Sequence, residues 1–476
     1  MNNKTIFTIL FVMFFTSAGA QSLTKQQMLE DYDQLYTTLT KNNPYFAVRK
    51  HVTGIDIPKE MRSIRHDIDT VTCDGGFYDV IFRALIACND KHVSPNQTND
   101  SVAMARTMEA YRKHFRYGDS RVINVSYIDG KYLTQGWQNK EGKVVIPWFS
   151  ELTHVNGISI DKYVAKYNRL VNDATRWDFK HKKAWTTKLF DPRLACKADS
   201  FKVTFIVDDK PQTVNMSGLG PIHPRSVFDD NVFKVDYFQR DSTLYIRIPR
   251  MNYGKIEWVE DEIAKHKGKP FNRVVIDVRD NGGGTDMMWI RVISAIIDKP
   301  LHFNLWQASK DIGVFTPEDS IQKPIKVYGD RLIACYDQGD WTTLNPSERS
   351  LGYDGKIYVL VNENIFSSTS SFLSVCQKID RLVSVGRPTG YFVGIGATPW
   401  GDILRNSRFS YRYPVTIETT DADPRHPETY YKDQVEIEVW PTIEELRTQA
   451  FYNKGQHIED FLYNHDWVFR KILTLP

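Results

Sequence analysis

The feature that most constrains the fold is a strand that leads through a serine-rich turn into a helix. Residues Ile357–Val361 form an uninterrupted apolar, β-branched run, which is typical of a strand buried on both faces. Apolar residues then recur at helical spacing from Phe372 to Cys376, which predicts a helix that begins near Ser370. Ser367 is therefore expected in the turn between strand and helix.

Two interpretations of this turn stay open on its residues alone. A hydroxyl placed there lies beside the unpaired N–H groups of the helix start, which can stabilise developing negative charge, as nucleophilic serines require. Alternatively, the four consecutive hydroxyl residues from Ser367 to Ser370 only cap the helix.

A second strand favours the first interpretation. Residues 274–278 are another apolar run, and the chain then continues into three consecutive glycines, 282–284. Glycines let the backbone turn sharply and expose its N–H groups to a ligand, and a simple tight turn needs only one of them. The two strand-to-turn motifs together suggest an oxyanion hole that faces a nucleophile.

The sequence resembles the tail-specific, or C-terminal-processing, serine peptidases, whose catalytic core is shared with tricorn protease and retinoid-binding relatives. Residues 276–284 resemble the strand and glycine loop of that family, residues 361–370 its nucleophile segment, and residues 385–390 the turn that follows. The resemblance extends from about Leu23 to Asp460. It implies Ser367 as the nucleophile, with an oxyanion hole built from the N–H groups of Gly283 or Gly284 and of Ser368.

The resemblance also implies the general base. Family members of the tricorn-like branch use a histidine in a short Asp-x-His segment after a helix, and Asp90 to His92 fits that segment. The other branch uses a lysine after the Thr-x-Gly turn, and residues 389–398 contain no lysine. The chain is thus assigned to the His-dependent branch. Two residues depart from the family pattern. Tricorn has a serine at the position of Lys91, and many relatives have a glutamate at the position of Ser370.

A histidine base needs an acid that holds its tautomer, and relatives supply a glutamate shortly before a late strand. Residues 435–439 alternate like that strand, so Glu428 is the first choice. Glu418, Asp421 and Asp423 occupy the same acidic loop and remain alternatives, and any one of them can be a solvated loop carboxylate.

The N-terminal residues read as a cleavable signal peptide. Lys4 supplies positive charge, residues 6–15 are apolar, and Ala18-Gly-Ala20 is a small-residue cleavage pattern. The apolar stretch is too short to span a bilayer, and no second long apolar run follows. We therefore expect a periplasmic or secreted protein without a membrane span.

The fold class expected is α/β with several domains. Residues 1–20 are the signal peptide, 21–118 an N-terminal helical region that carries His92, 119–220 a degenerate PDZ-like, β-rich module, and 221–476 the catalytic core. The resemblance implies a crotonase- and ClpP-like ββα arrangement for that core. Thr24 and Gln27 form a capping box that starts the first helix.

Composition excludes several other classes of function. A net charge of +3 over 476 residues without a basic cluster argues against nucleic-acid binding. The five cysteines form no Cys-x-x-Cys pair and no other metal spacing occurs, so neither a metal nor a cofactor is expected. Reduced cysteines are favoured over a Cys73–Cys88 disulfide. Nothing in the sequence indicates an oligomeric state.

The sequence thus predicts an exported serine endopeptidase that cleaves peptide or protein substrates through an acyl-enzyme, with Ser367 and His92 as its catalytic pair. The alternatives are a catalytically silent peptide- or ligand-binding protein on the same fold, and a hydrolase of esters or small amides.

Overall fold

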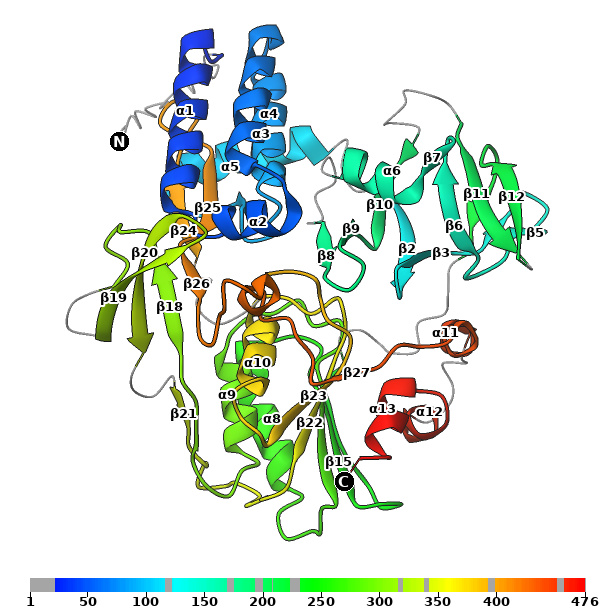
Figure 1. The fold of residues 1–476 in the computed structure, drawn as a ribbon. Helices are drawn as coiled ribbons and strands as arrows, with labels where there is room; N and C mark the ends of the chain where they lie inside the picture. Colours follow the sequence, from blue (N-terminus) through cyan, green and yellow to red (C-terminus); the bar gives the residue numbers. More distant parts are fainter. Residues whose placement is uncertain are drawn as a thin grey trace, which may run out of the picture.

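The computed structural model contains a mostly parallel sheet, with the helical region above it and the β-rich part at the upper right in the view of Figure 1. It describes residues 22–115, 122–168, 175–192, 200–207, 209–222, 232–315, 320–337, 342–392, 399–451 and 458–475. The predicted signal peptide and Cys196 lie outside these ranges. Within them, no helix is both long and apolar enough to cross a membrane.

The central sheet has six strands. In spatial order they are β14 (Lys234–Phe238), β15 (Thr243–Arg247), β16 (Arg273–Asp277), β22 (Ile357–Val361), β23 (Leu382–Gly386) and β27 (Ile437–Glu438). Only β14 runs antiparallel to its neighbour, and the other pairings are parallel. The two apolar runs of the sequence are therefore neighbours at the middle of the sheet.

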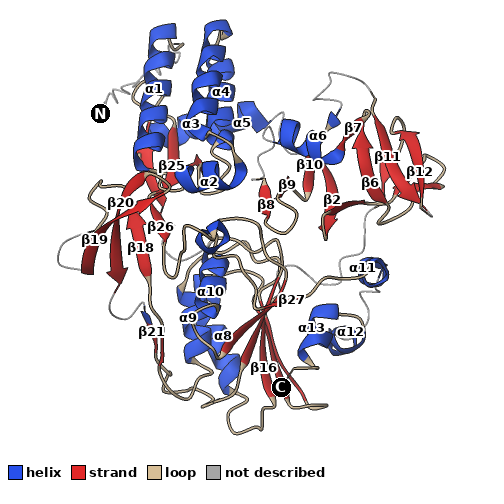
Figure 2. Cartoon of the chain, in the orientation of Figure 1, coloured by secondary structure: helices blue, strands red, loops and turns tan. Residues whose placement is uncertain are grey.

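Helices cover both faces of this sheet, which explains why its strands are apolar throughout. Successive residues of a strand point to opposite faces. Val359 packs with α8 (Ile256–Ala264), α9 (Met287–Ser294) and α10 (Ser368–Cys376), whereas its neighbours Tyr358 and Leu360 pack with α12 (Ile458–Asn464) and α13 (Trp467–Ile472). Figure 2 shows these helices on the two sides of the strands.

The N-terminal region is helical, as predicted. It comprises α1 (Lys25–Asn42), α2 (Phe46–Thr53), α3 (Ile57–Arg65), α4 (Asp74–Ala87) and α5 (Ser101–Phe115). The capping box of Thr24 and Gln27 is present at the start of α1. These helices share one apolar core with β25 (Ser410–Pro414), which pairs with β1 (Ser94–Pro95) and β24 (Pro399–Ile403). The helical region is thus completed by strands from the far end of the chain.

The β-rich module forms a separate sheet, ordered β10 (Lys188–Phe190), β2 (Val122–Ile128), β3 (Lys131–Thr134), β6 (Glu151–Val155), β11 (Lys202–Val207) and β12 (Lys210–Asn215), with β7 (Ile158–Ser159) paired to β6 and α6 (Ile160–Tyr167) packed beside it. Strands β2 and β3 form a hairpin around Asp129 and Gly130. A small sheet contains β13 (Gly220–Pro221), β4 (Trp137–Gln138) and β5 (Val144–Ile146). A short hairpin, β8 (Arg176–Asp178) and β9 (Lys183–Trp185), extends from the module toward the core (Figure 1).

A four-stranded sheet flanks the core on the other side. Its order is β19 (Ser320–Val327), β20 (Asp330–Asp337), β18 (Trp306–Ser309) and β26 (Thr416–Glu418), and the pair β17 (Leu301–His302) and β21 (Thr343–Leu344) lies next to it in sequence. Within the described residues, the other helices are α11 (Ile443–Phe451) and the short 3₁₀ turns η1 (His66–Thr70), η4 (Tyr253–Lys255) and η6 (Pro427–Tyr430).

Two predicted boundaries differ from the structure. Helix α10 begins at Ser368, two residues before the predicted start, because apolar periodicity appears only in its second turn. The late strand predicted over 435–439 is reduced to Ile437–Glu438, because it pairs with only two residues at the edge of the sheet. No disulfide joins Cys73 and Cys88, of which Cys73 is exposed and Cys88 is buried.

Candidate active site

The two sequence motifs meet at one edge of the central sheet. Strands β16 and β22 are parallel and in register, with Val274 opposite Ile357 and Asp277 opposite Leu360. The glycine loop and the serine turn follow the carboxyl ends of these strands, where ligands bind in open α/β sheets. They touch, since a Cβ added at Gly283 would lie 2.7 Å from the Cβ of Ser367.

Ser367 has an unusual backbone conformation. Its φ of 57° and ψ of −126° lie in a sparsely populated region that costs on the order of 1–3 kcal/mol for a residue with a side chain. Its carbonyl accepts hydrogen bonds from the N–H groups of Ser370 and Ser371, but its hydroxyl makes no capping bond to α10. The hydroxyl is directed elsewhere, so the simple capping interpretation does not describe this residue.

The partner of that hydroxyl is His92. The Nε2 atom of His92 lies 3.3 Å from Ser367 Oγ, although 275 positions separate the two residues. His92 is in the turn that follows α4, where its backbone N–H donates to Asp90 Oδ1 at 2.8 Å. The same oxygen lies 3.6 Å from the ring Nδ1. The structure therefore brings the predicted nucleophile and base together, with an aspartate behind the imidazole.

Asp90 is itself held by a cation from another helix. Arg49 of α2 donates through Nη2 to Asp90 Oδ2 at 3.0 Å, and through Nη1 to the carbonyl of Cys88. Both side chains are almost fully buried. Burial alone would raise the pKa of Asp90, but the charge of Arg49 and the hydrogen bond from the backbone N–H of His92 outweigh it and hold that pKa well below its usual range. Asp90 is thus a fixed negative charge beside His92.

An aromatic wall fixes the plane of the imidazole. The ring of Phe366 stacks on His92 with centroids 4.5 Å apart. Phe366 also donates its backbone N–H to the carbonyl of Asn281 at 3.1 Å, which joins the serine turn to the glycine loop. The ammonium group of Lys91, at the position where tricorn has serine, lies over the rings of Phe366 and Tyr391.

The backbone amides near Ser367 distinguish between the predicted oxyanion donors. The N–H of Gly283 donates to Asn281 Oδ1 at 2.9 Å, so it is already engaged within the loop. Within the described part of the chain, the N–H groups of Gly284 and Ser368 donate to no other group. Gly284 has a φ of 143° and lies against the carbonyl of Met251, where a Cβ would not fit. The available donors are thus those of Gly284 and Ser368.

A buried ionic network supports the glycine loop from below. Asp277, at the end of β16, accepts hydrogen bonds from Arg247 at 3.0 Å and from Arg279 at 2.7 Å. Arg279 also donates to Asp466 at 2.6 Å, at the start of α13. Burial opposes the charged form of Asp277, but the two arginines hold its pKa well below the usual range. The C-terminal helix is thereby tied to the loop that carries the glycines.

The predicted acid, Glu428, is not beside His92. It lies on η6, and its Oε1 is 3.2 Å from the Nδ1 of His426. The alternative carboxylates have partners other than His92. Glu418 is buried and ion-paired with Lys378 at 2.6 Å, and Asp423 is ion-paired with Arg425. No described contact joins Asp421 to His92. Asp90 occupies the place for which Glu428 was predicted, since it is bound to the histidine turn itself.

The described residues contain no group of three or more histidine, cysteine, aspartate or glutamate side chains that could hold a metal ion. What the assembled groups can do follows from their types. A hydroxyl in contact with an imidazole, with N–H donors alongside, suits nucleophilic attack on a carbonyl carbon.

Comparison with known proteins agrees with this geometry. Residues 242–399 match the model of peptidase family S41. This match contains the glycine loop and the serine turn, whereas His92 lies before it. No curated protein sequence matches the chain significantly.

Among solved structures, mature CPAF aligns with a TM-score of 0.54 and 12% identity, over 90% of this chain and 95% of its own. Mature CPAF complexed with lactacystin aligns with a TM-score of 0.51 and 13% identity, over 90% and 96%. At such identities the likeness concerns the fold, which extends over nearly the whole chain. Residues 242–399 thus match peptidase family S41, and the rest of the chain shares the fold of the aligned structures.

Proposed function

We propose that this protein is an exported serine endopeptidase in which Ser367 and His92 form the catalytic pair. The observation that carries the proposal is the 3.3 Å contact between His92 Nε2 and Ser367 Oγ. This distance is within the range of nucleophile–base pairs in ligand-free enzymes, which tighten when substrate binds.

The proposed reaction has two stages. His92 accepts the proton of Ser367 while the serine oxygen attacks the peptide carbonyl, and the N–H groups of Ser368 and Gly284 stabilise the resulting oxyanion. His92 then returns the proton to the leaving amine, which leaves an acyl-enzyme ester on Ser367. A water molecule, activated by the same imidazole, hydrolyses that ester.

Asp90 is proposed to serve as the acid partner through position and charge. Its 3.6 Å separation from Nδ1 is too long for a hydrogen bond. It instead fixes the histidine turn through the backbone N–H and stabilises the imidazolium electrostatically. Arg49 moderates that stabilisation, because its own positive charge faces the same carboxylate.

Export rests on the signal-peptide pattern of residues 1–20, which supports a periplasmic or secreted location. The β-rich module is proposed to act as a PDZ-like platform for an extended peptide, by strand addition. Its β8–β9 hairpin supports a role next to the site: Asn89 of the histidine turn exchanges two hydrogen bonds with Thr175, which directly precedes β8.

The test is digestion of an unfolded protein by the purified mature chain, followed by mass spectrometry of the products. Wild type should release peptides with new termini, and Ser367→Ala should release none. Ser370→Ala is the matched control, because it removes a hydroxyl from the same turn whose oxygen has no hydrogen-bond partner. Cleavage of small esters without cleavage of peptides would favour the esterase alternative, and a well-folded protein that cleaves neither would favour the binding protein.

A further inference from the structure

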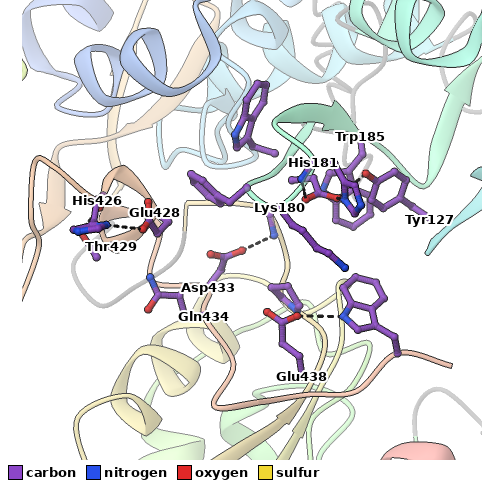
Figure 3. Close-up of a pocket in the computed structure, with 16 residues that line it drawn as sticks. Tyr127, Lys180, His181, Trp185, His426, Glu428, Thr429, Asp433, Gln434 and Glu438 are labelled. Atoms are coloured by element: carbon purple, nitrogen blue, oxygen red, sulfur yellow. Dashed lines mark hydrogen bonds and ion pairs between the residues drawn. The ribbon is translucent and has the colours of Figure 1, made fainter. Parts of the chain in front are cut away.

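A cavity of about 540 Å³ lies between the β8–β9 hairpin and residues 426–440. Three indole side chains line it, from Trp177 and Trp185 on the hairpin and from Trp440 after β27. Tyr127 lies on the same side as Trp185 and stacks on it with ring centroids 4.6 Å apart (Figure 3). We call this cavity the indole pocket. A pocket of this size and lining is suited to a side chain rather than to water alone.

Carboxylates outnumber cations around the indole pocket. The carboxylates of Asp178, Glu428 and Glu438 line it, as does Asp433, whose pKa is raised to about 7 by burial. Lys180 is the only lysine or arginine among the lining residues described. The ammonium group of Lys180 is paired with Asp129, which does not line the pocket, at 2.5 Å. Its charge is therefore already compensated, and the net charge facing the pocket is negative.

Two of these carboxylates lie where they can contact a ligand bound in the pocket. Glu428 lies at one side, where only its Oε1 contacts His426, and Glu438 lies at another, where its Oε2 accepts from the indole N–H of Trp440 at 3.1 Å (Figure 3). In each of these two glutamates, the other carboxylate oxygen takes no part in the contact just described. Asp433 is buried deeper and accepts from the N–H of Gly390 at 2.6 Å.

The indole pocket adjoins the catalytic groups. Gly390 lines it and also lines the smaller neighbouring cavity formed by Asp90, Lys91 and Phe366. The carbonyl of Gly390 accepts from the backbone N–H of Trp177 at 3.0 Å, so the hairpin wall of the pocket is fixed to the segment beside the histidine turn. The indole pocket and the cavity beside the histidine turn therefore share Gly390 in their walls.

We propose that the indole pocket is a subsite for a cationic side chain, lysine or arginine, of the bound polypeptide. Cations are attracted to the faces of indole rings. Trp185 is already stacked on Tyr127 and lies 4.7 Å from the guanidinium of Arg176. The indoles of Trp177 and Trp440, which also line the pocket, are therefore the ones assigned to a bound cation. The carboxylates of Glu428 and Glu438 add ion pairs at the rim, and they repel an acidic side chain. This subsite assignment rests on the proposed peptidase function, because it supposes that a polypeptide is the ligand.

Peptide binding to the Ser367→Ala protein tests the subsite apart from catalysis. The probes are fluorescently labelled nine-residue peptides of alanine, serine and glutamine, with one lysine moved through each position. Matched peptides carry norleucine or glutamate there instead. Fluorescence anisotropy should show one position at which lysine lowers Kd at least tenfold relative to norleucine, with glutamate the weakest.

The carboxylates are tested in the same background. The double substitution Glu428→Gln with Glu438→Gln should remove most of the lysine advantage, whereas Glu436→Gln should keep it, since Glu436 is exposed on the same segment but does not line the pocket. Both glutamates of the double variant are at least partly exposed, so folding is expected to be retained.

The subsite proposal is overturned if no position favours lysine over norleucine by more than twofold, or if the advantage survives the double substitution. The peptidase proposal fails separately. Wild type that cleaves peptides with no lysine preference refutes only the subsite, whereas selective binding by a wild-type protein that cleaves nothing refutes only the peptidase.

Discussion

Substitution of Gly283 by alanine is the sharpest perturbation of the proposed site. The new Cβ would lie 2.6 Å from the carbonyl oxygen of Phe366 and 2.7 Å from the Cβ of Ser367, where ordinary contacts begin at 3.4 Å. Either the glycine loop or the serine turn must move by about 0.8 Å. A misplacement of this size costs on the order of 100-fold in rate. The residue also has a φ of 100°, which strains any side chain by about 1–3 kcal/mol.

We therefore expect Gly283→Ala to lower kcat/KM for an unfolded substrate about 100-fold, and to lower the free energy of unfolding by about 2 kcal/mol. The matched control is the preceding residue: Gly282 is exposed, and a Cβ there would meet no atom within 4 Å. Gly282→Ala should stay within about threefold of wild type. Equal activity of the two variants, with both folded by circular dichroism, would refute the close approach of loop and nucleophile.

Two further substitutions test the electrostatics. Asp90→Asn should lower kcat/KM about 100-fold. At 3.6 Å an unopposed charge would stabilise the His92 imidazolium by about 5 kcal/mol at an effective dielectric of about 20, and the charge of Arg49 offsets roughly half of this. A loss below threefold in steady-state assays would contradict this. Asp433→Asn should stabilise the protein at pH 8 but not at pH 4. Burial raises the pKa of Asp433 to about 7 from 3.8, so folding takes up a proton between these values and stability falls as pH rises through this window, by on the order of 4 kcal/mol. Urea titrations from pH 4 to 8 measure the difference, and a constant or reversed one would be inconsistent with it.

Much of the core could be predicted because its signals are local. The apolar runs of β16 and β22 mark strands buried on both faces, and the glycines and serine that follow them mark turns. Once the two strands are neighbours and parallel, both turns must lie at the same edge of the sheet. The resemblance to a family supplied the base, because nothing in the chain near Ser367 indicates a histidine 275 positions away.

The acid partner of His92 is the part of the site that the sequence specifies least. The loop around Glu428 contains several carboxylates, and their spacing does not tell which one faces a distant imidazole. Asp90 carried a usable signal, since an aspartate two residues before a histidine readily accepts its backbone N–H. Arg49, which holds Asp90, comes from another helix and had no signal in the sequence at all. The packing of the β8–β9 hairpin against Gly390, which creates the indole pocket, likewise had no signal in the sequence.

The most direct test of the central claim is labelling with a fluorophosphonate probe, which reacts only with an activated serine, followed by mass spectrometry of the modified peptide. One adduct is expected, on Ser367. It should be absent in Ser367→Ala, and the rate at which it forms should fall at least 100-fold in His92→Ala. Labelling at an unchanged rate in folded His92→Ala, or no labelling of the folded wild type, would contradict a catalytic pair of Ser367 and His92.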